Sequence, residues 1–290
     1  MNGTRQTKPV LAWANHRLEL GKRTHVMGIL NVTPDSFSDG GHFFSPEKAI
    51  EHGLAMARDG ADIIDVGGES TRPFSQGVPL DEELDRVIPV IGALCKDLKI
   101  PISVDTVKSE VALEALKVRA SLINDISALR FDPRMVRVAS DAGVPVILMH
   151  MKGTPSDMQQ DPTYDDLIGE ILDFLKQAMA RAVEGGIKED RIIVDPGIGF
   201  GKSFDHNLEL IGALDRFQAL QRPVLLGTSR KGFLGYLLNK EPLERDTGTM
   251  ATIAAGVMNG AHLVRVHNVK MAVDTVRVID AIRTKSISRE

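Results

Sequence analysis

Three acidic or amide side chains stand at the ends of separate apolar runs, where they could bind one ligand. Asp105 follows Ile-Ser-Val, Asn124 follows Leu-Ile, and Asp195 follows Ile-Ile-Val. A buried carboxylate is costly unless it is paired or hydrogen-bonded, and one such residue alone fits a structural role equally well. A carboxylate accepts two parallel N–H bonds, whereas an amide both donates and accepts. If the three runs end at one cavity, they predict recognition of a flat heterocycle with several N–H donors.

Basic side chains follow the last two apolar runs of the chain. Lys231 comes after the seventh run, and Arg265 and His267 stand at the end of the eighth. A lone Lys or Arg after a strand is usually solvated. Two cations and an imidazole at one rim instead favour an anionic substrate group, of which phosphate is the expected one. Thr71 and Arg72 lie in a polar loop with Gly and Pro neighbours, and we expect this loop to form a mobile lid.

Eight apolar runs alternate with helical patterns along the chain. The runs are continuous rather than alternating, which is typical of a parallel sheet covered on both faces. The predicted strands span residues 25–31, 62–67, 102–106, 122–126, 144–149, 192–194, 223–227 and 263–266. The predicted helices span residues 45–59, 81–98, 108–118, 133–141, 164–184, a segment capped by Ser203 or Asp205, 249–258 and 270–282. Eight such units predict an α/β fold, the (β/α)8 TIM barrel, with its site at the carboxyl ends of the strands.

The chain is expected to hold one barrel and a short extension. Residues 10–24 contain two alternating stretches that predict a hairpin. We therefore assign residues 1–24 to an N-terminal hairpin-like extension that covers the bottom of the barrel, and residues 25–290 to the (β/α)8 barrel.

Composition excludes several classes of protein. The net charge of −4 over 290 residues argues against a basic nucleic-acid binder. A single cysteine, Cys95, excludes an intramolecular disulfide and indicates a reducing compartment. Its apolar neighbours at helical spacing predict a buried structural thiol rather than a nucleophile. We find no apolar signal core and no run long enough for a membrane span, so the expected location is the cytoplasm.

Two further site hypotheses are weak on the sequence alone. The segment 197–203 resembles a phosphate loop, but Pro196 stands where the full pattern needs Gly. The glycine spacing also fails the dinucleotide fingerprint, so we expect small residues beside a ligand there. The chain has no cluster with structural-metal spacing. A Mg²⁺ held by a few oxygens and a substrate phosphate would leave little trace, and Asn31 could supply one ligand, although such an Asn is more often a turn former.

Several motifs, taken in order, closely resemble those of the bacterial dihydropteroate synthases. They cover the chain from about residue 25 to residue 278. The motifs are Gly-Ile-Leu-Asn-Val-Thr-Pro-Asp-Ser-Phe-Ser-Asp-Gly-Gly at 28–41, Gly-Glu-Ser-Thr-Arg-Pro at 68–73, Ser-Val-Asp-Thr at 103–106, Asn-Asp-Ile at 124–126, Asp-Pro-Gly-Ile-Gly-Phe-Gly-Lys at 195–202, Ser-Arg-Lys at 229–231 and Arg-Val-His at 265–267. Each motif is weak alone, but the ordered set is very specific.

The resemblance implies a TIM-barrel homodimer that makes dihydropteroate for folate synthesis. The implied reaction joins 7,8-dihydropterin-6-ylmethyl diphosphate to 4-aminobenzoate and releases diphosphate, with Mg²⁺ as cofactor. The residues implied to hold the pterin are Asp105, Asn124, Asp195 and Lys231, and those implied to engage the diphosphate are Asn31, Arg265 and His267, with Asn31 also a metal ligand. The residues implied to frame the 4-aminobenzoate and its lid are Thr71, Arg72, Pro73, Phe200 and Ser229.

The implied mechanism needs no protein nucleophile. Mg²⁺, Arg265 and His267 would neutralise the leaving diphosphate. Asp105 would stabilise a cationic methylene group, which the neutral arylamine then attacks. Asp35, Ser36 and Phe37 belong to a loop that would close over the site. Where the family loop continues Ser-Thr-Arg-Pro-Gly, this chain has Phe74, and we expect that residue to affect arylamine affinity and sensitivity to sulfonamides.

Two alternative functions stay open at this point. A pterin-binding methyltransferase domain would share the Asp and Asn contacts, but it should lack the motifs at 70–73 and 229–231. A non-catalytic paralogue should have lost some diphosphate-binding groups, whereas Asn31, Arg265 and His267 are all present. Phe74 is the one feature that favours the paralogue.

Overall fold

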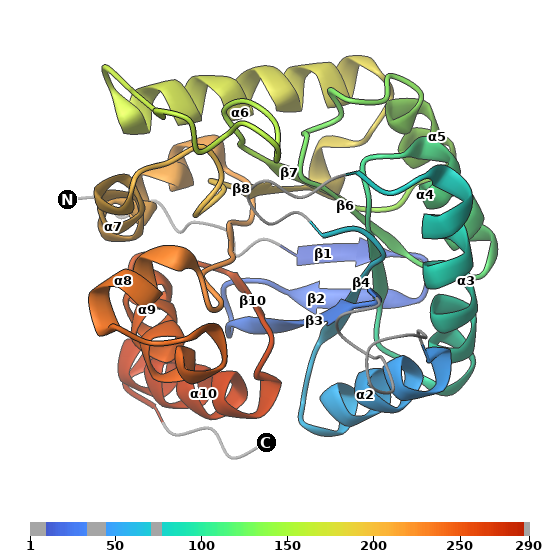
Figure 1. The fold of residues 1–290 in the computed structure, drawn as a ribbon, viewed down its shortest axis with the longest axis horizontal. Coiled ribbons are helices and arrows are strands. Elements are labelled where there is room, and N and C mark those ends of the chain that lie inside the picture. The colour runs from blue at the N-terminus through green and yellow to red at the C-terminus, as the bar shows by residue number, and fades with distance from the viewer. Residues whose placement is uncertain (1–9, 34–44, 71–76, 287–290) are drawn as a thin grey trace.

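The computed structural model describes residues 10–33, 45–70 and 77–286 (Figure 1). The predicted lid residues Thr71, Arg72 and Pro73, the departure at Phe74 and the loop segment 35–37 therefore lie outside the described residues.

Eight parallel strands form a nearly closed barrel, which confirms the predicted (β/α)8 fold. The strands are β3 (His25–Asn31), β4 (Ile63–Gly67), β5 (Ile102–Asp105), β6 (Leu122–Asp125), β7 (Val146–Met149), β8 (Ile192–Asp195), β9 (Leu225–Leu226) and β10 (Leu263–Val266). Their order around the sheet is β8-β7-β6-β5-β4-β3-β10-β9, and a single bridge between Val194 and Val224 joins its two ends. β9 is shorter than predicted, because Pro223 has no N–H to donate to a ladder.

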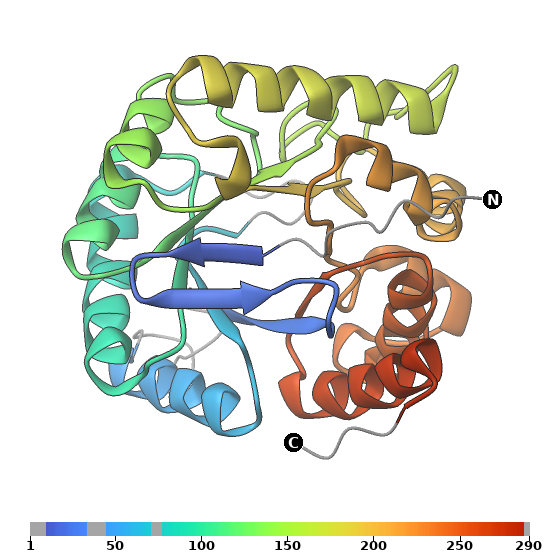
Figure 2. The ribbon, with the colours of Figure 1, turned by 180° about the vertical axis from the view of Figure 1, so that it is seen from behind.

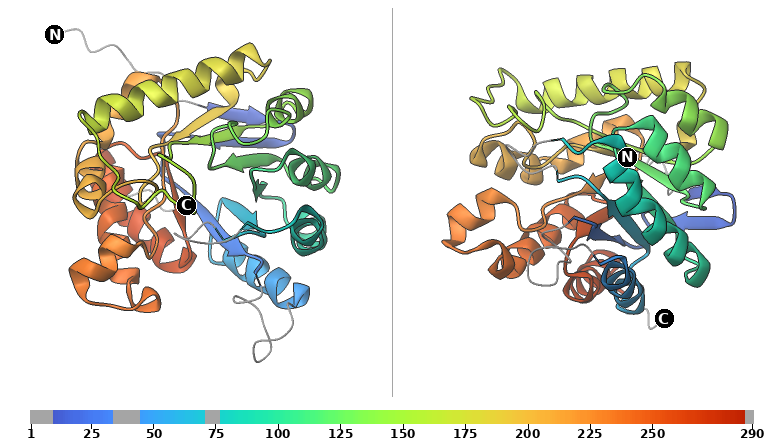
Figure 3. Two further views of the ribbon diagram at one scale, coloured as in Figure 1. Left: turned by 45° about the horizontal axis from the view of Figure 1, so that its top comes forward. Right: turned by 45° about the vertical axis from the view of Figure 1, so that its right-hand side comes forward.

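Helices surround the strands on the outside (Figure 3). They are α2 (Pro46–Arg58), α3 (Leu80–Asp97), α4 (Ser109–Lys117), α5 (Met135–Ala142), α6 (Leu167–Glu184), α7 (Phe204–Gly212), α8 (Gly232–Leu238), α9 (Asp246–Met258) and α10 (Val269–Thr284). Ser45 caps α2 and Ser203 caps α7, as predicted. α6 begins later than predicted, because Asp166 accepts from the Gly169 amide and caps it there. The sequence analysis missed α8 and three 3₁₀ turns, at Glu189–Arg191, Leu214–Leu220 and Pro242–Glu244.

Alternate residues along each strand face opposite sides of the barrel wall. One set packs outward against the helices in the main core; it includes Val26, Leu30, Ile64, Val66 and Val104. The other set points inward, and its lower members form an apolar floor. The floor consists of Met27, Ile63, Leu122, Ile147, Ile193, Leu225 and Leu263. The inward positions above the floor are largely polar, and they form the site described below.

A two-stranded hairpin completes the apolar floor. The predicted hairpin is present as β1 (Val10–Trp13) and β2 (His16–Glu19), which pair antiparallel and cross one end of the barrel (Figure 2). Leu11, Trp13 and Leu18 of the hairpin join the floor cluster, as does Leu20, which follows β2 directly. The indole Nε1 of Trp13 donates to the Ser121 carbonyl at 2.6 Å. The division into two domains at residue 24 stays a prediction.

Within the described ranges, the structure has no helix with the length and apolar character that crossing a membrane requires.

Trp13→Ala should destabilise the protein through its floor. Trp13 is 3% exposed, and truncating a buried Trp costs about 3–5 kcal/mol in unfolding free energy. Urea unfolding followed by far-UV circular dichroism measures the loss. Val10→Ala is the matched control, because Val10 lies on the same hairpin but is 42% exposed. Equal, small losses for both variants would contradict the role assigned to the floor.

Candidate active site

The guanidinium of Arg265 joins two carboxylates above the floor. Its Nε donates to Asp65 Oδ2 and its Nη2 to Asp105 Oδ2, each at 2.6 Å. Asn124 Nδ2 donates to the same oxygen of Asp65 at 2.9 Å. Four side chains from four strands therefore form one hydrogen-bonded cluster. Two of the three residues predicted to bind a heterocycle, Asp105 and Asn124, belong to it.

Asp65 is the residue of this cluster that the sequence analysis missed. It lies inside β4 rather than at its end, and its side chain is fully buried. Its position relative to Gly67 indicates the inward face, because residues two apart on a strand point to the same side. Oδ1 of Asp65 is buried without a hydrogen-bond partner among the residues that the structure describes. A buried acceptor of this kind calls for a donor from a ligand or a water.

Asn31 lies at the same level of the barrel as the cluster. In the strand register, Asn31 pairs with Gly67, Gly67 with Asp105, and Asp105 with Asn124. Registered neighbours in a parallel sheet point to the same face, so Asn31 faces inward beside the cluster. Gly67 leaves room between them, because a Cβ added there would lie 3.4 Å from Asp105 Cβ.

Asp195 is held by the loop that follows β8. Its Oδ1 accepts from the Gly197 amide at 2.7 Å. Gly197 and Gly201 have φ values of +73° and +64°, and an added Cβ would lie 1.9 Å and 2.4 Å from the carbonyl oxygens of His150 and Lys152. Close packing on the β7–α6 loop therefore accounts for these two glycines, whereas Gly199 of the same segment lies against Lys231.

An apolar wall and a cation lie beside this loop. Phe200 packs with four other side chains in a small cluster: Ile126, Met149, Met151 and Met158. Lys231 Nζ lies 4.0 Å from the centroid of the Phe200 ring, at cation–π distance. Gly199 makes room for it, since an added Cβ would be 3.0 Å from Lys231 Cδ. Burial, together with the nearby charge of Arg265, lowers the pKa of Lys231 to about 8.

His267 is hydrogen-bonded to Ser229 at the end of β10. The Ser229 hydroxyl oxygen lies 2.8 Å from His267 Nδ1 and accepts from the His267 amide at 3.1 Å. Burial, with Arg230, Arg265 and Lys231, lowers the pKa of His267 to about 3. The imidazole is therefore neutral at neutral pH, which corrects the expectation that His267 brings positive charge. We assign the Ser229 hydroxyl as the donor to Nδ1. The neutral ring then carries its proton on Nε2, which stays available as a donor.

Burial raises the pKa values of two carboxylates in the site, whereas it lowers those of Lys231 and His267. It raises the pKa of Asp105 to about 7, with Arg265 opposing and Asp65 adding to the shift. It raises the pKa of Asp195 to about 6, against the amide of Gly197 and the charges of Lys231 and Lys202. The site thus holds carboxylates that ionise close to neutral pH, as sites for acid–base or cation-stabilising chemistry often do.

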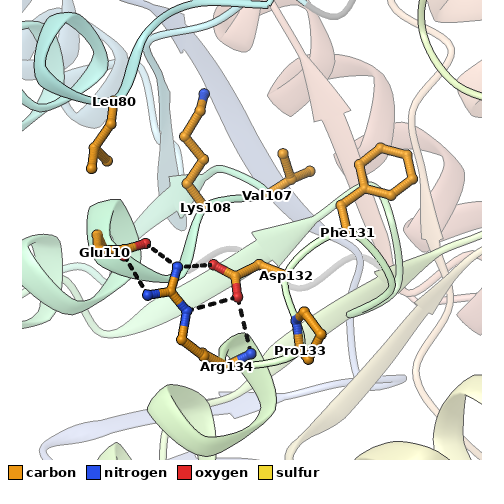
Figure 4. A pocket seen from close by; sticks show the side chains of 8 residues that line it. All are labelled: Leu80, Val107, Lys108, Glu110, Phe131, Asp132, Pro133 and Arg134. Carbon is orange, nitrogen blue, oxygen red and sulfur yellow. Dashed lines mark hydrogen bonds and ion pairs between the residues drawn. The ribbon is translucent and has the colours of Figure 1, made fainter.

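The larger surface pocket lies outside this cluster. It has a volume of about 550 Å³ and opens between the start of α3 and the loops before α4 and α5 (Figure 4). Its charged groups are paired: Arg134 with Glu110 and Asp132, and Lys108 with Glu69 and Glu83. A smaller cavity of about 90 Å³ shares its Val107 and Phe131 walls and reaches Asp105.

The described residues offer little for a resident metal. No group of three or more His, Cys, Asp or Glu side chains in these ranges could hold a metal ion. Asn31 therefore stands as one oxygen donor at the mouth, which fits a Mg²⁺ that is held mainly by water and substrate oxygens.

Known proteins share both the sequence and the fold. Residues 27–267 match the family model described as pterin binding enzyme, which defines the class of this barrel. The dihydropteroate synthase of Escherichia coli strain K12 is 48% identical over 89% of this chain and 91% of its own length. The chain belongs to the dihydropteroate synthase family, whose members are transferases.

Solved structures of the same family superpose closely. A Yersinia pestis dihydropteroate synthase in complex with a sulfonamide drug has a TM-score of 0.90 and 43% identity, covering 96% of this chain and all of the other. The Xanthomonas albilineans enzyme with 4-aminobenzoic acid has a TM-score of 0.89 and 46% identity, covering 96% and 99% of the two chains. The same enzyme in complex with 7,8-dihydropteroate has a TM-score of 0.86 and 43% identity, covering 95% and 99%.

Asp195→Asn should stabilise the protein without ligand more at high pH than at low pH. The folded-state pKa of Asp195, about 6, lies above its ordinary value. Folding stability is therefore lost as the pH rises from about 4 to about 6, and it stays lost above that. Asn has no charge to bury, so the gain in unfolding free energy should be about 2 kcal/mol larger at pH 8 than at pH 4.5.

Urea unfolding of both proteins at the two pH values measures this difference. Asp274→Asn, at an exposed position of α10, controls for the loss of one negative charge. A gain that does not depend on pH would contradict the raised pKa.

Proposed function

We propose that this chain joins a 7,8-dihydropterin-6-ylmethyl diphosphate to 4-aminobenzoate, giving 7,8-dihydropteroate and diphosphate. The observation that carries the proposal is the buried cluster of Arg265, Asp65, Asp105 and Asn124, with one acceptor of Asp65 left without a partner. A pterin carries several N–H donors on one edge, which are what these carboxylates need. The family relatives support the substrates, since one binds 4-aminobenzoic acid and 7,8-dihydropteroate.

The pterin is assigned to the carboxylate end of the pocket. The Asp105 and Asp195 carboxylates and the Asn124 amide oxygen would accept from its N–H groups, and the Asn124 amide could also donate to its ring. Lys231 would lie beside the ring. Asp65 joins this set in our proposal, because it fixes both Arg265 and Asn124. The residues are held from strands β4, β5, β6, β8 and β10, so the pocket needs little rearrangement to receive a planar ligand.

The diphosphate is assigned to the cationic end. Asp65 and Asp105 engage Nε and Nη2 of Arg265, which leaves the Nη1 donors for the leaving group. His267 would add a neutral N–H donor, held in place by Ser229. Asn31 would hold a Mg²⁺ together with diphosphate oxygens. When bound, the metal supplies charge neutralisation to the leaving group.

The arylamine is assigned to the outer part of the pocket. Phe200 would frame its ring, together with Ser229 and with Thr71, Arg72 and Pro73, which lie outside the described residues. The hydroxyl of Ser229 already contacts His267. We therefore infer that Ser229 joins the diphosphate and arylamine subsites rather than serving only the second.

The reaction follows as a dissociative substitution. The bond between the pterin methylene carbon and a diphosphate oxygen breaks first, and the electron pair leaves with the diphosphate. The electron-rich ring and the Asp105 carboxylate stabilise the methylene cation. The amine nitrogen then attacks the methylene carbon and afterwards loses a proton to water. The pocket contributes positioning and a fixed field rather than a protein nucleophile.

Quaternary structure and location complete the proposal. We expect a homodimer, because α9 and α10 leave apolar side chains exposed, with Met258 53%, Val278 60% and Ile282 57% exposed. We expect the enzyme to act in the cytoplasm, because a chain with one cysteine forms no intramolecular disulfide and so fits a reducing compartment. The motif Ser229-Arg230-Lys231 argues against the methyltransferase alternative.

Asp195→Ala and Lys231→Ala should each abolish most of the activity. Both side chains lie against the proposed pterin site, and losing one such electrostatic contact lowers kcat/KM by about 10²- to 10³-fold. Formation of dihydropteroate from labelled 4-aminobenzoate, the pterin diphosphate and Mg²⁺ measures it. Asp274→Ala is the surface control. Pterin binding without product in the unaltered chain would instead support the non-catalytic paralogue.

Asp65→Asn should raise the KM for the pterin diphosphate by about ten- to a hundredfold. Asn removes the negative charge that pairs with Arg265, and it replaces one carboxylate oxygen by an NH2 donor, so the acceptor left unpartnered for the pterin is lost. Steady-state kinetics with each substrate varied in turn measures the effect. Asp81→Asn, at an exposed position of α3, serves as the control. A KM within threefold of the unaltered value would remove Asp65 from the site.

A further inference from the structure

A buried lysine lies behind the site and takes no part in the reaction as proposed. Lys202 is 1% exposed and is one of the largest fully buried side chains described. Its Nζ donates to the Phe200 carbonyl at 2.9 Å and lies 2.9 Å from His150 Nδ1. Burying an amine is costly unless its hydrogen bonds are satisfied, and an apolar side chain could fill the same space without that cost.

The loop around Lys202 carries two groups of the proposed site. Phe200, whose carbonyl Lys202 binds, presents its ring to Lys231. Asp195 begins the loop, and its carbonyl accepts from the His150 amide at 2.9 Å. An added Cβ on Gly197 would lie 3.4 Å from Lys202 Nζ. Lys202 therefore lies inside the turn that separates the Asp195 carboxylate from the Phe200 ring.

His150 is itself held firmly by its surroundings. Its ring meets Phe174 edge-on with centroids 4.8 Å apart, and Tyr164 lies at 6.2 Å. The Tyr164 hydroxyl donates to the Gly201 carbonyl at 2.7 Å, one residue before Lys202. Burial, together with the charges of Lys202 and Arg130, lowers the pKa of His150 to about 2. The imidazole is thus neutral, and its Nδ1 can accept from the ammonium group.

We propose that Lys202 and His150 form a positioning pair that fixes the 195–202 loop, so that Asp195 meets the pterin and Phe200 meets the arylamine. The inference rests on the proposed function, because it deepens the role of that same site. Neither residue touches a substrate in this scheme. Lys202 acts through the Phe200 carbonyl and through its positive charge behind Asp195.

Burial lowers the pKa of Lys202 itself to about 7, so the amine is charged below that pH, where Asp195 takes up its proton. This charge gives the pair a second effect. Asp195 is faced by the Gly197 amide and by the cations Lys231, Lys202 and Arg265, all of which favour its ionised form. Without Lys202, the Asp195 carboxyl should take up a proton at higher pH. Because the ionised form accepts the pterin N–H groups, the loss of pterin affinity on acidification should then begin at a higher pH.

Lys202→Met is the first variant to make, since Met is similar in length and has no donor. We expect the Kd for the pterin diphosphate and the KM for 4-aminobenzoate to rise about ten- to a hundredfold. We also expect the acid limb of the pterin-binding profile to move to higher pH. Calorimetric titration between pH 5 and pH 8 measures the first ligand, and steady-state kinetics the second. Lys240→Met, at an exposed position after α8, is the charge control.

Two His150 variants test the pair even if Lys202→Met does not fold. His150→Asn keeps an acceptor oxygen near the place of Nδ1, whereas the similarly sized His150→Leu does not. Both lose the ring contacts with Phe174 equally, so a purely structural role predicts equal constants. We expect Asn to stay within about threefold of the unaltered protein and Leu to lose about tenfold or more.

Each outcome decides one question. Unchanged constants in Lys202→Met, or equal constants in the two His150 variants, would overturn the positioning pair while the unaltered chain remains active. If the unaltered chain binds no pterin diphosphate and makes no product, the proposed function fails and the inference fails with it.

Discussion

The ion pairs of Arg265 hold the upper barrel together. Its two carboxylate partners are 200 and 160 positions away in the chain, so one guanidinium joins β10 to β4 and β5, and Asn124 extends the link to β6. The Asp65 side chain has no exposure, and the Arg265 side chain has 20%. Breaking such a pair leaves an uncompensated buried charge, which costs more than the pair contributes. These four strands are therefore held in one relative position at the level where the ligand is proposed to bind.

The apolar floor explains why these polar groups depend on one another. Trp13 and its neighbours in the hairpin close the barrel from below with the inward residues of the strands. The cluster is therefore separated from the hairpin end of the barrel by a layer of apolar side chains. Burial then raises the pKa of Asp105 to about 7 and that of Asp195 to about 6. These carboxylates can be stabilised by the basic residues at the carboxyl end of the barrel and by a ligand that binds there.

Much of this arrangement could be predicted from local patterns, and the remainder could not for physical reasons. Apolar runs bounded by turns located the eight strands, and Asp105 and Asn124 were found because they end such runs. Asp65 was missed because a search at strand ends ignores the two-residue period, which places it on the same face as Gly67. The neutrality of His267 depends on its burial. The contact between Lys202 and His150 joins residues that are 52 positions apart in the chain. No spacing in the sequence encodes those properties.

The distribution of charge also bears on the need for a metal. Arg265 is already shared by two carboxylates, Lys231 has a lowered pKa next to Phe200, and His267 is neutral. Among the described residues, little positive charge is left uncompensated for a departing diphosphate. For that reason we propose a Mg²⁺ that would be held by Asn31 and the diphosphate oxygens, where it would supply the missing positive charge to the leaving group.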